Sequence, residues 1–236
     1  MTLQIDRIQA LCFDIDGTLS DTDDAYVQKV ACWLRPGRFL LPNRDESRLA
    51  RRMVMALETP GNLFHSFSDR IGLDRVLAQW NDRLIKVGRE RWEINTILMP
   101  GVRELLSELH SRYPMAVVSA RGERTVLAFL EQHELIHFFQ VIVSGQSVRF
   151  TKPFPDPILY AAQGMHVLPE ACLMIGDTTV DILAGKAAGA QTVGVLCGFG
   201  EREELQRVGA DIILDHTNEL NYALNGFVTL PYKTDK

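Results

Sequence analysis

The sequence lacks any long apolar run. Nowhere do about 18 uncharged apolar residues follow one another, which is the length that a membrane-spanning helix needs. The first residues also bring Asp6 and Arg7 before any apolar stretch of signal-peptide length. We therefore expect no membrane partner and a protein of the cytoplasm.

Basic residues are in the minority. The chain has 25 Lys and Arg against 30 Asp and Glu, which gives a net charge of −5. Proteins that bind the phosphate backbone of nucleic acids normally carry a basic excess or a basic stripe. Nucleic acid is therefore not an expected partner, and no feature of the sequence specifies an oligomeric state.

Cysteine is scarce and shows no ligand pattern. The four cysteines, Cys12, Cys32, Cys172 and Cys197, form no CxxC pair and have no zinc-like spacing. Three of them lie in or beside apolar, strand-like runs. We expect buried thiols in a reducing compartment.

Short apolar runs rich in β-branched residues recur along the chain. They cover residues 8–14, 115–119, 139–143, 172–176, 192–196 and 211–214. Segments with apolar residues at helical spacing lie between them, at 102–112, 123–133, 157–166 and 180–188. This alternation predicts βαβ units and an α/β fold with a doubly wound, mostly parallel, Rossmann-like sheet.

The stretch after the first run has no strand alternation. Residues 21–95 have helical patterning, and Asn43 with Glu46 resembles a capping box. This stretch has a charge of +2, and the rest of the chain has a charge of −7. We predict a catalytic core of residues 1–20 and 96–236, with an inserted all-helical domain of residues 21–95.

Two pairs of acidic residues follow predicted strands. Asp14 and Asp16 end the first strand, and Asp177 and Asp181 follow the strand at 172–176. Ligand sites in open α/β sheets lie at the carboxyl edge of the strands. Two close carboxylates repel one another unless a cation or a shared proton intervenes, and carboxylate oxygens suit Mg²⁺. Asp181 has a second interpretation as a helix-capping residue.

Two further positions suit a phosphate group. Ser119 ends a predicted strand and is followed by Ala120 at a helix start, so its hydroxyl and the next N–H group are placed to hold a phosphate oxygen. Lys152 lies in the loop TKPFPDP, where three prolines stiffen the chain that presents its ammonium group. Together with the acidic pairs, these residues form a candidate site for phosphoryl chemistry.

The order DxDGT, Ser, Lys-Pro and GDxxxD, which spans Asp14 to Asp181, resembles the haloacid dehalogenase superfamily of phosphatases and phosphotransferases. The helical insertion resembles the superfamily's cap of the first type. The tail, with Cys-Gly-Phe-Gly at 197–200 and Gly-Ala-Asp at 209–211, is similar to phosphoglycolate-phosphatase-like members.

The resemblance implies a two-step phosphoryl transfer. Asp14 would be the nucleophile that forms an aspartyl phosphate, and Asp16 the general acid and base. Mg²⁺ would be held by the Asp14 carboxylate, the Asp16 backbone carbonyl and the Asp177 carboxylate. Asp181 would orient Lys152 or the metal-bound waters.

The resemblance also implies a phosphate-binding set. Ser119, Ala120 and Lys152 would hold the phosphoryl oxygens, and Gly17 and Thr18 would bring backbone close to them. The physical reason is that a phosphomonoester is already anionic, so a carboxylate attacks it only when positive charge offsets the repulsion.

Substrate selection is assigned to arginines. Arg121 stands where many relatives have a lysine, so it either assists phosphate binding or faces solvent. Arg44, Arg48 and Arg52 lie at i, i+4 and i+8 in the predicted cap. They form either a solvated helix face or a clamp for an anionic substrate tail.

The expected function is a Mg²⁺-dependent phosphatase that acts on a small phosphorylated metabolite. A sugar phosphomutase with the same core is the first alternative, and a non-catalytic phosphate-binding relative is the second. A phospho-accepting signalling module uses similar residues, but such modules are much shorter. A true dehalogenase needs neither Asp16 nor Asp177.

Overall fold

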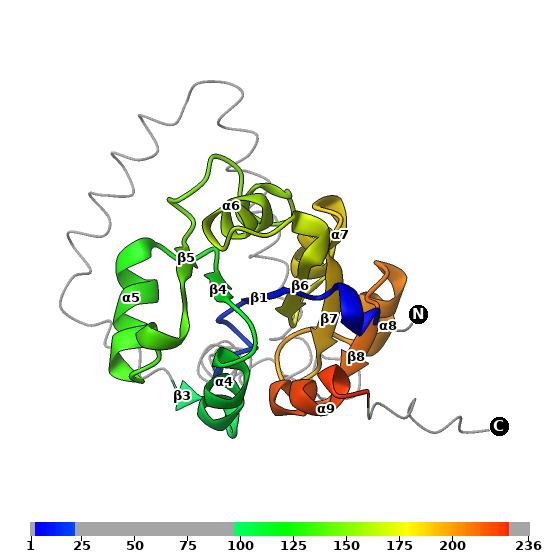
Figure 1. The fold of residues 1–236 in the computed structure, drawn as a ribbon, viewed down its shortest axis with the longest axis horizontal. Helices are drawn as coiled ribbons and strands as arrows, with labels where there is room; N and C mark the ends of the chain where they lie inside the picture. Colours follow the sequence, from blue (N-terminus) through cyan, green and yellow to red (C-terminus); the bar gives the residue numbers. More distant parts are fainter. Residues whose placement is uncertain (1–2, 22–96, 227–236) are drawn as a thin grey trace, which may run out of the picture.

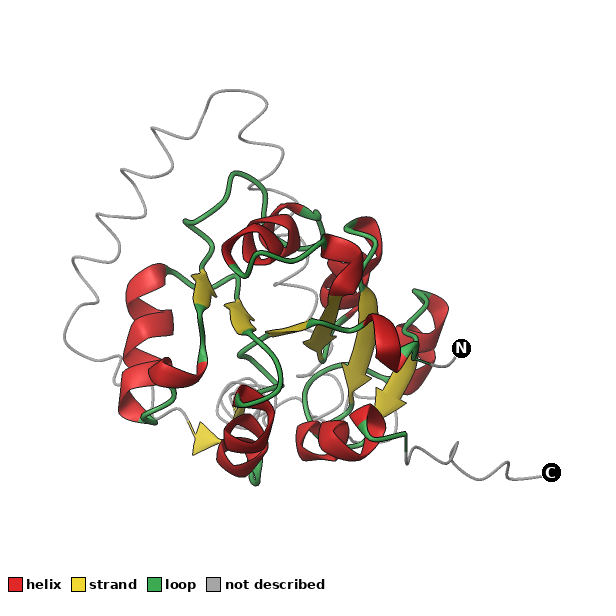
Figure 2. Ribbon diagram, viewed as in Figure 1, coloured by secondary structure: helices red, strands yellow, loops and turns green. Residues whose placement is uncertain are grey.

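A six-stranded sheet forms the centre of the computed structural model, which describes residues 3–21 and 97–226 (Figures 1 and 2). The strands are β1 (Ala10–Phe13), β4 (Met115–Val118), β5 (Val141–Val143), β6 (Cys172–Gly176), β7 (Gln191–Val195) and β8 (Ile212–Leu214). Every pairing in this sheet is parallel. The predicted doubly wound α/β fold is confirmed.

The strand order, β5-β4-β1-β6-β7-β8, places the first strand in the middle of the sheet. The chain runs outward from β1 through β4 to β5, and then returns to the other side of β1 to form β6, β7 and β8. The direction of winding therefore reverses between β1 and β6. In open α/β sheets, ligands bind at such a switch point, outside the carboxyl ends of the strands.

Helices cover both faces of the sheet (Figure 1). They are α4 (Val102–His110), α5 (Glu123–Gln132), α6 (Asp156–Gly164), α7 (Thr179–Ala187), α8 (Arg202–Arg207) and α9 (Leu220–Leu224). Short 3₁₀ helices are η1 (Ile5–Arg7), η4 (Ile136–Phe138), η5 (Pro169–Ala171) and η6 (Thr217–Glu219). The first four α-helices match the predicted segments, whereas α8 and α9 are too short to give a helical apolar pattern.

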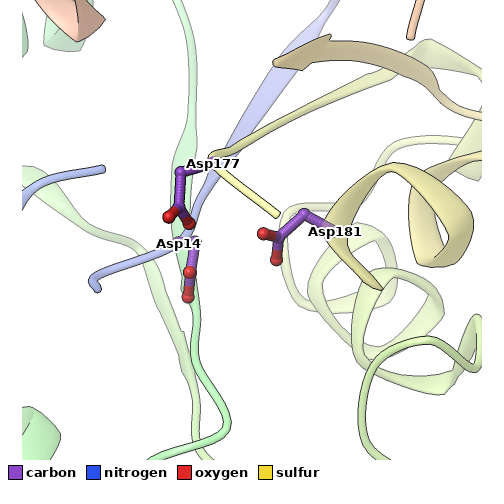
Figure 3. A group of neighbouring side chains, drawn as sticks. All are labelled: Asp14, Asp177 and Asp181. Atoms are coloured by element: carbon purple, nitrogen blue, oxygen red, sulfur yellow. The ribbon is translucent and has the colours of Figure 1, made fainter. Parts of the chain in front are cut away.

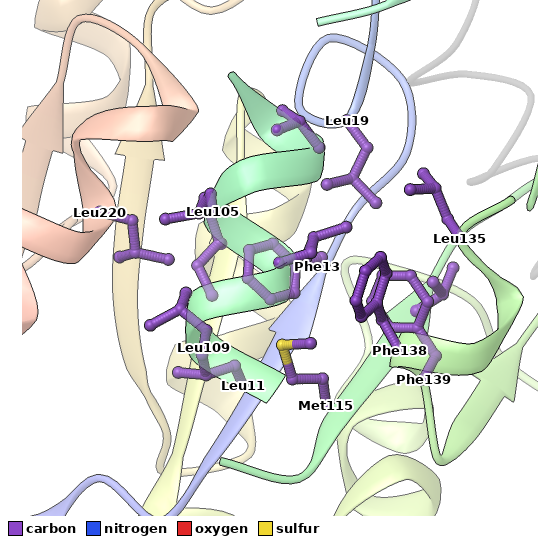
Figure 4. Close-up of a cluster of buried hydrophobic side chains, with 14 of the residues drawn as sticks. Leu11, Phe13, Leu19, Leu105, Leu109, Met115, Leu135, Phe138, Phe139 and Leu220 are labelled. Carbon is purple, nitrogen blue, oxygen red and sulfur yellow. The ribbon is translucent and has the colours of Figure 1, made fainter. Parts of the chain in front are cut away.

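Strand β1 is buried on both faces, and its two faces differ in side-chain size. Leu11 and Phe13 belong to a cluster of large side chains with helices α4 and α9 (Figure 4). Ala10 and Cys12 belong to the opposite cluster with residues of α6 and α7. Small residues on that side let the helices approach closely: a Cβ at Gly185 of α7 would lie 2.6 Å from the Thr192 side chain. The sheet is thus firmly held from both sides.

A short antiparallel pair joins the two described segments. β2 (Ser20–Asp21) pairs with β3 (Ile97–Leu98), which brings residues 21 and 97 together. The N–H of Met99 also donates to the carbonyl of Leu19 at 2.9 Å. The predicted helical cap lies outside the described residues except for Asp21, so its boundaries stay a prediction.

Candidate active site

Asp14 follows β1 directly and extends its pairing with β6. Its N–H donates to the carbonyl of Ile175 at 2.9 Å, which fixes the residue beside the end of the neighbouring strand. Its carboxylate lies in a group with those of Asp177 and Asp181, in which one ligand atom from each lies within 4.8 Å of the others (Figure 3). All three residues are buried, so their mutual repulsion is poorly screened by water.

Asp177 directly follows the neighbouring strand β6 and is held by the loop that follows β7. Its side chain is buried, and its Oδ2 accepts a hydrogen bond of 2.7 Å from the N–H of Phe199. A Cβ at Gly17 would lie 2.2 Å from the same oxygen. Gly17 also has a φ of +68°, which favours glycine. Gly17 therefore packs directly against Asp177 in this structure.

Asp181 lies in the first turn of α7 and contacts both Thr178 and Lys152. Its Oδ2 accepts hydrogen bonds from the N–H and the hydroxyl of Thr178, at 3.0 and 2.7 Å. Its Oδ1 contacts the Nζ of Lys152 at 2.6 Å. Asp181 therefore caps the start of α7 with one oxygen and contacts Lys152 with the other.

Lys152 lies between two carboxylates in the interior. Its side chain is only 4% exposed, and its Nζ is 2.7 Å from Asp14 Oδ1 and 2.6 Å from Asp181 Oδ1. Burial alone would lower the pKa of Lys152, but the carboxylates of Asp14 and Asp181 raise it above its usual range. The ammonium group therefore stays charged.

The pKa of Asp14 is raised to about 8, chiefly because burial disfavours its charged form. The contact with Lys152 opposes this rise, and the charges of Asp181 and Asp16 add to it. One lysine therefore does not fully compensate the buried acids in the protein alone. A further cation beside Asp14 would favour the ionised carboxylate that a nucleophile requires.

Ser119 directly follows β4 at the same edge of the sheet. Its N–H donates to the carbonyl of Val143 at 2.9 Å, and its Oγ accepts from the N–H of Arg121 at 3.2 Å. Ala120 follows it and is exposed. Thr18 is buried on the facing loop, where its carbonyl accepts a 2.7 Å hydrogen bond from Thr217. Within the described ranges, the Thr18 hydroxyl has no hydrogen-bond partner.

Arg121 contacts Asp16 rather than solvent. Its Nε donates to Asp16 Oδ2 at 2.7 Å, and its Nη2 pairs with Asp16 Oδ1. Such two-point contacts fix the plane of a carboxylate. The side chain of Arg121 is 13% exposed and that of Asp16 is 29% exposed. The spacing of these residues in the sequence gives no sign of this pair.

The structure thus brings together the residues from the ends of β1, β4 and β6 and from the Lys152 loop. Arg44, Arg48 and Arg52 lie outside the described residues. Sequence reasoning missed the hydrogen bond from Phe199, because its donor is a backbone group that any residue type except proline provides. It also missed Thr178, whose signal was available as a Thr three residues before an acid at a helix start.

The charges at this edge of the sheet suit a divalent cation. Asp16 pairs with Arg121, and Asp14 and Asp181 pair with Lys152. Asp177 lies beside Asp14 and Asp181. Four acids against two bases leave a charge of −2 when all are ionised. The fold and this site define an α/β protein whose clustered carboxylates and buried lysine lie at the switch point of a parallel sheet.

Comparison with known proteins gives the family. The model of the haloacid dehalogenase-like hydrolases matches residues 11–195, and the chain belongs to this family. It is 27% identical to a phosphoglycolate phosphatase of Salmonella typhimurium over 244 residues, with 94% of each chain covered. It is 28% identical over 242 residues to a phosphoglycolate phosphatase of Escherichia coli K12, again with 94% of each covered.

Solved structures that share the fold include the following two, each with more than 25% identity. A HAD family hydrolase from Deinococcus radiodurans with bound phosphate and sodium is 26% identical, with a TM-score of 0.69 and coverage of 94% of this chain and 96% of that one. A hydrolase from Pseudomonas syringae is 28% identical, with a TM-score of 0.64 and coverage of 94% of this chain and 100% of that one.

Among the described residues, no helix has the length and apolar character that a membrane span requires.

Proposed function

We propose that this protein is a Mg²⁺-dependent phosphatase that hydrolyses a small phosphomonoester through an aspartyl phosphate on Asp14. The chain is a hydrolase of phosphoric monoesters. We propose which residues carry out the hydrolysis and which metal ion assists them. The observation that supports this function most strongly is the burial of Lys152 between Asp14 and Asp181 at the switch point of the sheet. A buried ammonium group beside a nucleophilic carboxylate fits a substrate that is itself an anion.

The acidic residues fit a small, hard cation. Asp14 and Asp177 offer carboxylate oxygens, the ligand type that Mg²⁺ prefers, and the backbone carbonyl of Asp16 is proposed as a third ligand. When bound, the cation supplies positive charge that offsets the negative charge of the phosphomonoester. The excess of carboxylates over cationic side chains supports this assignment.

The first step is the attack of an Asp14 oxygen on phosphorus. The new bond joins Asp14 to the phosphoryl group, and the bond to the leaving oxygen breaks. Asp16 gives a proton to that oxygen, so that a neutral alcohol leaves. The ammonium group of Lys152 offsets the negative charge of the phosphoryl oxygens, and the Ser119 hydroxyl donates a hydrogen bond to one of them. Arg121 stabilises the Asp16 carboxylate that proton donation leaves behind.

The second step reverses these roles. The Asp16 carboxylate takes a proton from water as the water oxygen attacks phosphorus. The bond to Asp14 breaks, inorganic phosphate leaves, and Asp16 carries the proton for the next cycle. Asp181 keeps Lys152 beside Asp14 throughout, because it pairs with the same ammonium group.

The proposed substrate is a small phosphorylated metabolite whose leaving group carries a carboxylate, with phosphoglycolate as the first compound to test. The names of the curated relatives support this choice. Arg121 and the predicted cap residues Arg44, Arg48 and Arg52 are proposed to meet the anionic part of the substrate. The free cysteines among the described residues fit a reducing compartment, and we propose the cytoplasm.

Phosphate release from a panel of phosphate esters, with Mg²⁺ and with excess chelator, tests this function. Turnover should require Mg²⁺, and Asp177→Ala should raise the Mg²⁺ requirement or eliminate turnover. Calcium should inhibit, because its larger and more variable coordination disturbs the alignment of the reacting groups. Full activity in excess chelator contradicts the metal assignment. Transfer of the phosphoryl group back to a sugar phosphate, without release of inorganic phosphate, supports the mutase instead.

Replacing Asp16 separates acid catalysis from nucleophilic attack. Asp16→Asn should slow turnover of an alkyl phosphate by about 10²- to 10⁴-fold, because the poor leaving group needs a proton. The loss should be smaller for an aryl phosphate, whose phenolate leaves without one. The measurement is kcat/KM for both esters in both proteins, because this ratio reports the steps up to departure of the alcohol and leaves out the second step, in which Asp16 acts as a base. An equal loss for the two esters rejects the acid role of Asp16.

A further inference from the structure

The loop between β7 and α8 encloses the side chain of Asp177. We call residues 197–200, Cys-Gly-Phe-Gly, the glycine loop. The N–H of Phe199 donates to Asp177 Oδ2 at 2.7 Å. A Cβ at Gly200 would lie 1.8 Å from the backbone oxygen of Asp177. The glycine loop therefore contacts both the carboxylate and the main chain of this residue.

Gly198 approaches the carboxylate as closely as Gly17 does. A Cβ at this position would lie 2.2 Å from Asp177 Oδ2, and the three nearest atoms all belong to the Asp177 side chain. The backbone of Gly198 is not in the left-handed region, so alanine is compatible with its φ. A methyl group at position 198 would therefore be opposed chiefly by the Asp177 carboxylate.

The glycine loop is itself held against the loop that follows β1. Cys197 Sγ lies 3.4 Å from the carbonyl oxygen of Gly17 and 3.4 Å from Thr217 Oγ1. The Thr217 hydroxyl donates to the carbonyl of Thr18 at 2.7 Å. Phe199 is buried. These contacts restrict movement of the glycine loop away from Asp177.

We propose that Gly198 and the Phe199 N–H are positioning elements that fix the Asp177 carboxylate for the divalent cation. The N–H holds one oxygen, and the bare backbone of Gly198 allows the carboxylate to occupy this place. A carboxylate held in this way meets the cation without first losing side-chain freedom. The inference rests on the proposed function, because it concerns the affinity for the same cation.

Gly198→Ala tests the proposal, with Gly122→Ala as the matched control. Gly122 also lies at the carboxyl edge of the sheet, but a Cβ there would meet nothing closer than 4.0 Å. Mg²⁺ binding to the metal-free proteins is measured by titration calorimetry. We expect the Kd of Gly198→Ala to rise by about 10- to 100-fold, as changes around metal ligands commonly do. The Kd of Gly122→Ala should change by less than about twofold. Equal Kd values for Gly198→Ala and the unmodified protein overturn the proposal.

Thermal unfolding in chelator shows whether the contact with Asp177 causes the effect. Gly198→Ala should lower Tm in the unmodified background and have little effect in an Asp177→Gly background, where the whole opposing side chain, Cβ included, is gone. An equal loss of Tm in both backgrounds overturns the proposal, because the methyl group then meets something else. This measurement needs no metal. Absence of Mg²⁺ binding to the unmodified protein would contradict the proposed function, whereas normal binding with an unchanged Gly198→Ala variant contradicts only the positioning role.

Discussion

Asp14→Asn is expected to abolish turnover while the fold remains intact. The amide keeps the shape of the side chain but has no anionic oxygen with which to attack phosphorus. Removing the nucleophile of an enzyme that works through a covalent intermediate can lower kcat by about 10⁴-fold or more. Phosphate release from an alkyl and an aryl ester should both be lost, because the attack precedes departure of either leaving group.

Asp215→Asn is the control for this change. Asp215 is a surface acid whose side chain is 66% exposed and pairs with Arg202. Its replacement should leave kcat within about twofold of the unmodified protein, because exposed ion pairs contribute little. Circular dichroism and thermal unfolding verify that both variants are folded. Substantial steady-state hydrolysis by Asp14→Asn rejects its role as the nucleophile.

Lys152→Met should have the largest effect on stability and also a severe effect on activity. The change leaves the buried carboxylates of Asp14 and Asp181 without their shared cation. Breaking a buried ion pair by removal of one partner costs about 3–5 kcal/mol in the free energy of unfolding. In chelator, denaturant unfolding should show a loss of this size. Turnover should fall by about 10²- to 10³-fold, the cost of losing one group that stabilises developing negative charge.

Lys186→Met provides the matched control. Lys186 Nζ contacts Asp211 Oδ2 at 2.6 Å, but the lysine side chain is 33% exposed. Solvent screens this pair, so its removal should cost about 1 kcal/mol or less and should leave kcat unchanged. If the two lysine variants lose equal stability, or if Lys152→Met retains full turnover, the burial of Lys152 between two acids is not important for function.

The central part of the fold could be predicted because each strand has a simple pattern. β1, β4 and β6 are short, continuous apolar runs, and the polar residues that follow them, Asp14, Ser119 and Asp177, share one edge of a parallel sheet. The carboxylates of Asp14 and Asp177 come together for this reason. Helices α8 and α9 could not be predicted, because they span only residues 202–207 and 220–224.

The finer contacts of the site depend on tertiary structure. The pairing of Arg121 with Asp16 joins residues 105 positions apart, and nothing in the spacing of either residue indicates it. The hydrogen bond from Phe199 to Asp177 depends on the path of the glycine loop, which the side chain of Phe199 does not specify. The glycines at 17, 198 and 200 can be read from the sequence. The atoms that each of them contacts can be identified only in the packed structure. The predicted cap and its arginines remain predictions.

The aspartyl phosphate on Asp14 is the central claim, and peptide mass spectrometry after acid quench during steady-state turnover tests it most directly. The peptide that contains Asp14 should carry the added mass of one phosphoryl group in the unmodified protein. Asp14→Asn should carry no phosphoryl group. Asp16→Asn should carry more aspartyl phosphate than the unmodified protein if loss of the base slows hydrolysis of the aspartyl phosphate more than loss of the acid slows its formation. A phosphoryl group on another residue, or direct hydrolysis in which turnover continues with Asp14 never modified, would contradict the mechanism.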